Sequence, residues 1–67
     1  MAVYNTIELT GVSAESWSDA AHTALADASR TIRNITRLEV IDTHAEVDGG
    51  VISEFHTTVR IYFRVES

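Results

Sequence analysis

The sequence predicts an α+β fold of the order β-α-β-β, in which a three-stranded antiparallel sheet curls around one helix. Apolar and polar residues alternate over 2–10 and again over 51–65, which is typical of strands with one buried face. Between these stretches, residues 14–33 carry apolar side chains at spacings of three and four, which is typical of a helix. An Asp-Gly-Gly turn at 48–50 predicts a hairpin before the last strand.

The first strand is predicted over residues 2–10 and is expected to end at Gly11. Val3, Ile7 and Leu9 share one face, because side chains two apart point to the same side of a strand. The opposite face carries the polar and aromatic side chains Tyr4, Thr6, Glu8 and Thr10.

The helix is predicted over residues 14–33, with Ser13 as its N-cap and Asn34 as its stop. Its apolar stripe consists mostly of alanine, so the helix is expected to lie close to the sheet. Trp17 belongs to this stripe and is expected to be a packing residue. The stripe comprises Trp17, Ala20, Ala21, Ala24, Leu25, Ala28 and Ile32.

The second strand is predicted over residues 36–47, and its apolar residues change sides. Leu38 and Val40 stand at even positions, whereas Ile41, Ala45 and Val47 stand at odd ones. One extra residue in a strand reverses its faces, so the switch predicts a β-bulge near residue 42.

The third strand, 51–65, is the longest and is placed in the middle, giving the order 1-3-2. One face is apolar and is expected to meet the helix at Ala21, Ala24, Ala28 and Ile32. The other face is polar. The apolar set is Phe55, Val59, Ile61, Phe63 and Val65, and the polar set is His56, Thr58, Arg60, Tyr62 and Arg64.

Size and composition predict a single domain, 1–67, that self-assembles. A chain of 67 residues without cysteine buries a small core, and such chains are commonly stabilised by oligomerisation. The net charge of −5 disfavours nucleic acid and anionic membranes as partners. Without a membrane-length apolar run or a signal peptide, the chain is expected in the cytoplasm.

Three segments are informative together: Val-Tyr-Asn-Thr-Ile-Glu-Leu-Thr-Gly-Val-Ser at 3–13, Arg-Leu-Glu-Val at 37–40, and Val-Arg-Ile-Tyr-Phe-Arg-Val-Glu at 59–66. They resemble the dodecin family, in which the segment similar to 37–40 reads Trp-Phe-Glu-Val. The resemblance implies a hollow homododecamer of cubic 23 symmetry. It further implies storage or buffering of flavins such as riboflavin and FMN, without catalysis.

The resemblance also assigns two ligand-binding positions. In flavin-binding members, a Trp early in the second strand stacks on the isoalloxazine and a Gln in the third strand binds the ring edge. These positions fall on Arg37 and His56 here. Losing an aromatic face removes roughly 1–3 kcal/mol of stacking, so flavin binding is expected to be weakened or absent. Arg37 is open between a ligand contact and an ion pair between subunits.

The metal-binding candidates are Asp42, Glu46 and Asp48, which alternate along the second strand. Ca²⁺ takes six to eight oxygen ligands, so symmetry-related strands would have to contribute, and the alternative is a solvated acidic face. Ser16-Trp17 together with Arg37 resembles a branch of the family associated with calcium. The three histidines show no zinc spacing, and no zinc site is predicted.

The sequence contains no recognisable nucleophile–base pair, carboxylate dyad or phosphate loop, which predicts that the protein is not an enzyme. The expected function is a dodecin-like shell that binds or stores a small ligand or ion, a cation or a small anion ahead of a tightly held flavin. Two alternatives stay open. One is a flavin-storage dodecin in which Arg37 replaces the stacking Trp, and the other is a purely structural assembly module.

Overall fold

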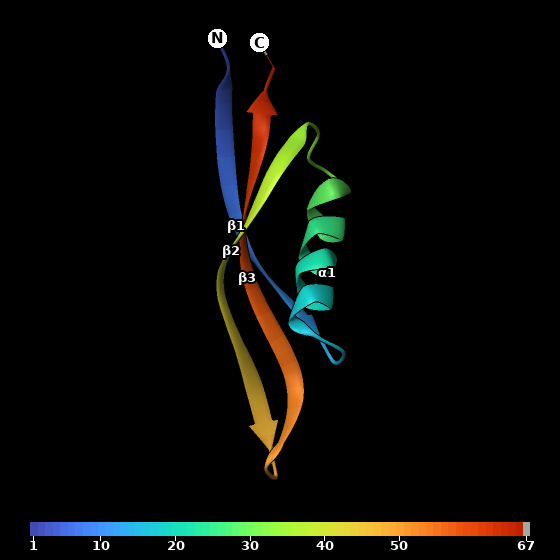
Figure 1. Cartoon of the computed structure of the whole chain (residues 1–67). Helices are drawn as coiled ribbons and strands as arrows, with labels where there is room; N and C mark the ends of the chain where they lie inside the picture. Colours follow the sequence, from blue (N-terminus) through green and yellow to red (C-terminus); the bar gives the residue numbers. More distant parts are fainter. Residues whose placement is uncertain (67) are drawn as a thin grey trace.

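The computed structural model describes residues 1–66, and within them the order is β-α-β-β (Figure 1). The elements are β1 (Val3–Ser13), α1 (Trp17–Ser29), β2 (Ile35–Asp48) and β3 (Val51–Val65). The strands form one antiparallel sheet in the order β1-β3-β2, with β3 in the centre. The predicted fold class and strand order are confirmed. Ser67, the last residue of the predicted domain, lies outside the described residues.

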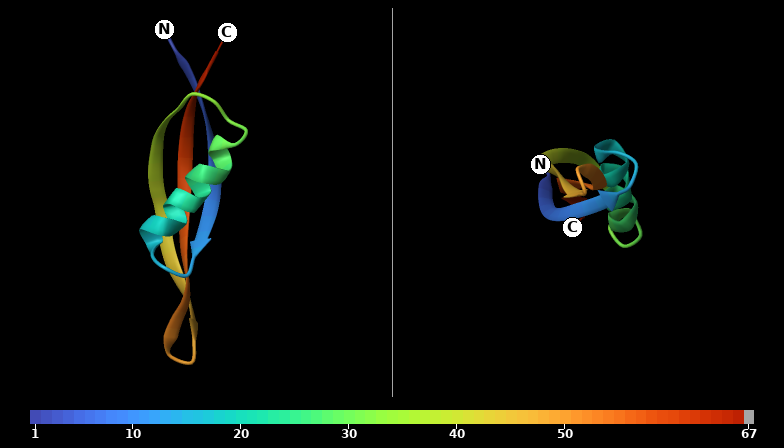
Figure 2. Two further views of the ribbon diagram at one scale, coloured as in Figure 1. Left: turned by 90° about the vertical axis from the view of Figure 1, so that its right-hand side faces the viewer. Right: turned by 90° about the horizontal axis from the view of Figure 1, so that it is seen from below.

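The molecule is long and narrow, with extents of 51 × 20 × 12 Å. The helix lies across one face of the sheet, against β1 and β3 more than β2. The β2–β3 hairpin runs on past the helix, so within residues 1–66 no other element covers its tip (Figure 2).

β1 does not end at Gly11, as the sequence had suggested, but continues to Ser13. Gly11 pairs with Thr57 and lies under the helix. A Cβ at Gly11 would stand 1.9 Å from the backbone oxygen of Ala20. The glycine is therefore needed for the close approach of α1 to the strand and is not a strand terminator.

α1 begins three residues later than predicted. The N-cap is Ser16, whose hydroxyl accepts a 2.9 Å hydrogen bond from the Asp19 N–H. Ser13, the predicted cap, is a strand residue that supports the entry to the helix. Its hydroxyl accepts from the Glu15 N–H at 2.9 Å and donates to the Asp19 carboxylate at 2.6 Å.

The helix also ends earlier, at Ser29 instead of Arg33. The N–H of Arg30 bonds to the Asp27 carbonyl three residues back, which is the tightened pattern of a last turn. Asn34 then takes a positive φ of 65° where the chain enters β2, after the helix has ended. Among the described residues, no helix has the length and apolar character to cross a membrane.

The core lies between α1 and the predicted apolar face of β3. Val59 and Ile61 are fully buried there, as expected from the alternation. The helix contributes alanines, which permit the short separation from the sheet. Phe55 and Phe63 lie on the same face and are half-buried. The buried helix residues are Ala20, Ala24 and Ala28, and partly buried neighbours include Ile7, Leu9, Ala21, Leu25, Ile32 and Leu38.

The predicted bulge in β2 is confirmed. Val40 pairs with Val59 and Asp42 with Thr58, which leaves Ile41 as the extra residue. A second irregularity precedes Arg37, and a third falls between Glu46 and Val47. Each bulge bends a strand, and the sheet curls accordingly (Figure 1). The hairpin turn has positive φ at Gly49 (59°) and Gly50 (78°), as a two-residue turn of this kind requires.

Candidate functional site

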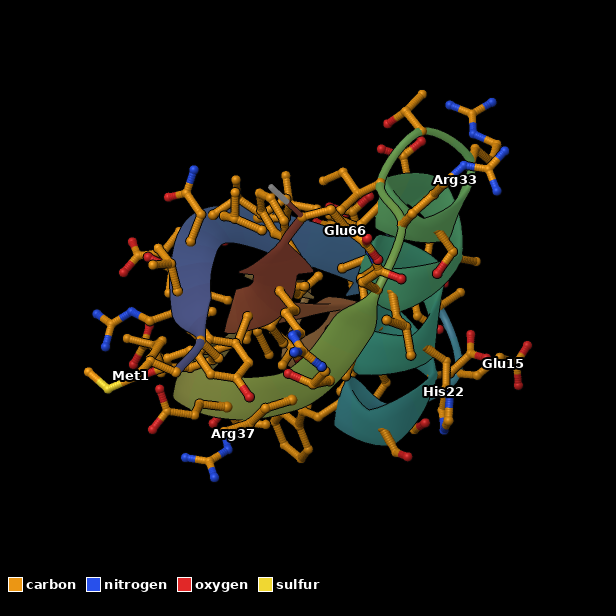
Figure 3. The ribbon with its side chains drawn as sticks, turned by 90° about the horizontal axis from the view of Figure 1, so that it is seen from above. Met1, Glu15, His22, Arg33, Arg37 and Glu66 are labelled. Atoms are coloured by element: carbon orange, nitrogen blue, oxygen red, sulfur yellow. The ribbon has the colours of Figure 1, made fainter. Side chains whose placement is uncertain are left out.

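The face of the sheet turned away from α1, called the open face below, carries the predicted site residues. Arg37 points away from the body of the molecule, on a different side from the helix residue His22 (Figure 3). By strand register, the face comprises Tyr4, Thr6, Glu8 and Thr10 of β1, Arg37, Glu39, Asp42 and His44 of β2, and His56, Thr58, Arg60, Tyr62 and Arg64 of β3.

One pocket on the open face contains Arg37. It has a volume of about 320 Å³ and is lined by Tyr4, Thr36, Arg37 and Tyr62, which we call the Arg37 pocket. The Arg37 guanidinium carbon lies 5.7 Å from the centroid of the Tyr62 ring, a cation–π contact. Thr36 reaches the pocket because it is the extra residue of the irregularity between Ile35 and Arg37.

A charged row crosses all three strands beside this pocket. Arg60 donates to Glu8 at 2.9 Å and lies 3.7 Å from Glu39. The Tyr62 hydroxyl donates a 2.6 Å hydrogen bond to Glu39. Hydrogen bonding to Glu8, and then to Tyr62, raises the pKa of Arg60 above its usual value. The row therefore uses both carboxylates, and among residues 1–66 no carboxylate lies within ion-pair distance of Arg37.

His56 lies in another part of the open face. It is six residues from Tyr62 along β3, a distance of about 20 Å in a strand. It stands opposite His44, with the ring centroids 4.7 Å apart and the planes inclined by 35°. Within one chain the structure does not bring His56 and Arg37 together.

The acidic candidates do not meet within the chain either. Asp42, Glu46 and Asp48 are spread along β2, and the register shift after Glu46 interrupts the ladder before Asp48. Over the described part of the chain, no three metal-ligating side chains gather around a common point. Asp42 instead contacts His44, with Oδ2 3.4 Å from Nδ1.

Trp17 joins the start of the helix to the hairpin strands. Its indole N–H donates to the His44 carbonyl at 3.1 Å, and its ring meets Phe55 edge-on at 4.8 Å. The Thr57 hydroxyl donates to the Trp17 carbonyl at 2.8 Å. These contacts confirm the expected packing role, although the residue is 41% exposed.

Sequence reasoning missed the pairing of His44 with His56. A two-residue turn at 49–50 would place His44 opposite Phe55, and the register agrees with that up to Val47 and Ile52. The unpaired Ser53 then shifts the ladder by one residue. Its hydroxyl donates to the Glu46 carbonyl at 3.2 Å. No pattern in the sequence marks this bulge.

Comparison with known proteins agrees with the fold and with the whole length of the chain. The family model "Dodecin" matches residues 3–66. A dodecin of Thermus thermophilus is 31% identical over 64 residues, which cover 96% of this chain and 93% of that protein. The crystal structure of a variant of the Thermus thermophilus dodecin has a TM-score of 0.95 at 30% identity and covers all of both chains.

A further similar structure is a calcium-chelating immunodominant antigen of Mycobacterium tuberculosis, described as a calcium dodecin. It has a TM-score of 0.83 at 29% identity, covering 96% of this chain and 91% of that one. The match to the family model over 3–66 and the agreement in fold lead to one conclusion: the chain belongs to the dodecin family.

Proposed function

We propose that the chain is a non-catalytic homododecameric shell that binds or stores a small ligand at the Arg37 pocket and binds flavin weakly or not at all. Membership of the dodecin family supports a self-assembling protein that binds small ligands. The observation that carries the proposal is Arg37 itself. It stands at the position that the family resemblance assigns to the stacking Trp, and its guanidinium covers the face of Tyr62.

The charge balance of the open face favours an anionic ligand in this pocket. The two nearby carboxylates, Glu8 and Glu39, are engaged by Arg60 and Tyr62. Within residues 1–66 Arg37 forms no ion pair, so its N–H groups are available to a ligand. A guanidinium binds carboxylate or phosphate groups with two parallel hydrogen bonds. The hydroxyl groups of Tyr4 and Thr36 add further donors. A small anion, or a ligand with an anionic group, is therefore the ligand class we assign.

A riboflavin titration tests the flavin part of the proposal. We expect the unaltered protein to quench riboflavin fluorescence little. Arg37→Trp should tighten binding at least tenfold, about 1.4 kcal/mol, because it restores an aromatic face and removes a charge. His56→Gln alone is the matched control and should give no such gain. If the single change fails, Arg37→Trp with His56→Gln should succeed, provided that His56 obstructs the ring edge.

Nanomolar riboflavin binding by the unaltered protein would contradict weakened flavin binding. That result would favour the alternative of a flavin-storage dodecin, in which the guanidinium stacks on the isoalloxazine. The contact of the Arg37 guanidinium with the Tyr62 ring supports this second candidate, because the guanidinium already lies over an aromatic face.

Calcium is the alternative ion, supported by the similarity to the mycobacterial calcium dodecin. Asp42, Glu46 and Asp48 remain the candidate ligands, and Ca²⁺ would need oxygens from several copies of the chain to complete its shell. Two measurements on the purified protein distinguish flavin binding, calcium binding and a purely structural role. They are absorbance between about 350 and 500 nm, the range of flavin absorption, and elemental analysis. A yellow protein indicates flavin, and a colourless one containing calcium indicates the ion. Neither signal favours a purely structural module.

The partners in this proposal are further copies of the chain and the small ligand. The net charge of −5 argues against binding to nucleic acid and to anionic membranes, because both repel an acidic surface. The cytoplasmic location predicted from the sequence is part of the same proposal.

A further inference from the structure

We propose that His44 and His56 form a binding site for a divalent transition-metal ion such as Zn²⁺ or Ni²⁺. The site lies on the open face, at the end of the sheet away from the Arg37 pocket. The two histidines are twelve residues apart in the sequence and stand directly opposite each other on β2 and β3. Within one chain this site is separate from the Arg37 pocket, because His56 lies six residues along β3 from Tyr62.

The ring separation fits two imidazoles on one ion. A zinc–nitrogen bond of about 2.0–2.1 Å places each ring centroid about 3.2 Å from the metal. At the observed centroid separation of 4.7 Å, the two rings would subtend about 95° at such an ion. That angle lies between the values for neighbouring ligands in octahedral and tetrahedral geometry. The backbone pairing holds the two rings side by side, and binding requires side-chain torsions that aim one nitrogen of each ring at the ion.

The second nitrogen of each ring already faces a carboxylate. Nδ1 of His44 lies 3.4 Å from Asp42 Oδ2, and Nε2 of His56 lies 3.2 Å from Glu54 Oε1. Metal-binding histidines almost always donate their other ring N–H to a carboxylate, a backbone carbonyl or water, which fixes the tautomer and raises the basicity of the ligand. This arrangement leaves Nε2 of His44 and Nδ1 of His56 for the metal.

Two imidazole ligands favour transition-metal ions over calcium. Two nitrogen ligands suit Zn²⁺, Ni²⁺ and Cu²⁺, whereas Ca²⁺ takes oxygen ligands. Over residues 1–66 no third metal-ligating side chain completes the group, so water fills the remaining positions. The His44 side chain is 49% exposed and that of His56 20%, so an ion can reach both from solvent within this chain.

Trp17 supplies a built-in reporter for this site. It is the only tryptophan in the sequence, and its indole N–H donates to the His44 carbonyl at 3.1 Å. A paramagnetic ion on the His44 ring is therefore expected to quench Trp17 fluorescence. Because Trp17 contacts the backbone of His44, replacing the His44 side chain leaves the reporter's own hydrogen bond in place.

The test is a Ni²⁺ titration of the untagged 67-residue chain, monitored by Trp17 fluorescence. We expect saturable quenching that excess Zn²⁺ reverses and that Ca²⁺ does not. His44→Gln and His56→Gln should each weaken Ni²⁺ binding at least about tenfold, because a single imidazole loses the advantage of two linked ligands. The double variant should bind little more weakly than either single variant, since both remove the same chelate.

His22→Gln is the matched control, because His22 is the third histidine and lies on the exposed side of α1 (Figure 3). It should leave the titration unchanged. Far-ultraviolet circular dichroism of each variant verifies the fold before metal is added. Absence of quenching, equal quenching in the two folded single variants and the unaltered protein, or an equal effect of His22→Gln would overturn the proposal. Losses that add in the double variant would also overturn it, because they would indicate two separate sites.

Discussion

At the scale of single residues, Tyr62 connects the two halves of the open face. Its ring lies under the Arg37 guanidinium, and its hydroxyl donates to Glu39. Glu39 belongs to the charged row, in which Arg60 lies near it and pairs with Glu8. Tyr62 therefore contacts both the Arg37 pocket and the charged row. Ring and hydroxyl can therefore be tested separately.

Tyr62→Phe keeps the ring and removes the hydroxyl. We expect a loss of about 1 kcal/mol in the free energy of unfolding, the typical net value of a hydrogen bond, because exposure to solvent weakens the bond to the carboxylate. Urea denaturation of Tyr62→Phe, Glu39→Gln and the double variant measures the coupling directly. If the two single effects simply add, the 2.6 Å contact between these groups contributes no coupling energy.

At the scale of elements, the fit of α1 to the sheet depends on small residues on both sides. Gly11 lies beneath the backbone of Ala20, and the helix presents alanines to β3. The helix begins at Trp17, after its N-cap Ser16, because β1 first passes under it and ends at Ser13.

Gly11→Ala should destabilise the fold by about 3 kcal/mol, the upper range for overpacking, because the new Cβ meets backbone that cannot rotate away. Gly49→Ala is the matched control. Gly49 has a φ of 59° and nothing near its Cβ position, so about 1–2 kcal/mol of conformational strain is expected there. Thermal unfolding of both variants compares the two costs, and a larger effect at Gly49 would contradict the close contact.

The register of β3 predicts that alanine substitutions destabilise the fold more on the helix-facing side of the strand than on the open face. Ile61→Ala should cost about 2–5 kcal/mol, since the side chain is fully buried under the helix. Thr58→Ala, on the open face, should cost less than about 1 kcal/mol, the value of its exposed 2.9 Å hydrogen bond to Thr10. Phe63→Ala, expected from the sequence to cost roughly 3–5 kcal/mol, should cost less than Ile61→Ala within one chain because Phe63 is only half-buried. Equal midpoints for Ile61→Ala and Thr58→Ala would mean that the register is shifted by one residue.

At the scale of the whole molecule, apolar side chains remain uncovered along the two hairpin strands, β2 and β3. Val40, Val47 and Val51 are each more than half exposed. A small core combined with such a surface favours association between copies, because burial of this area supplies free energy that one chain lacks.

Light scattering tests this expectation. We expect a mass near that of twelve chains of 7.4 kDa each at micromolar concentration. Val47→Asp with Val51→Asp should weaken the assembly, because it places charge in a surface expected to be buried. Glu15→Asp, which keeps the charge at an exposed position, serves as a control. A stable monomer of the unaltered chain would contradict the proposed shell.

Sequence alone determined the elements of this protein, because their signals are local. Alternation along β3, the helical spacing of the alanines and the glycine turn each follow from neighbouring residues, and even the bulge beside Asp42 was visible as a switch of apolar parity. The resemblance to the dodecin family assigned Arg37 to a ligand-binding position, and that assignment stays a prediction.

Tertiary structure decided what depends on contacts between distant residues. Gly11 looks like a terminator in sequence and is instead the point where the helix touches the strand. The unpaired Ser53 sets the register of the hairpin and so places His44 opposite His56, while Arg37 and His56 lie about 20 Å apart in one chain. Each bulge shifts the pairing of every residue beyond it, so the register at one position depends on all the bulges between it and the turn. A local sequence pattern does not predict their combined effect.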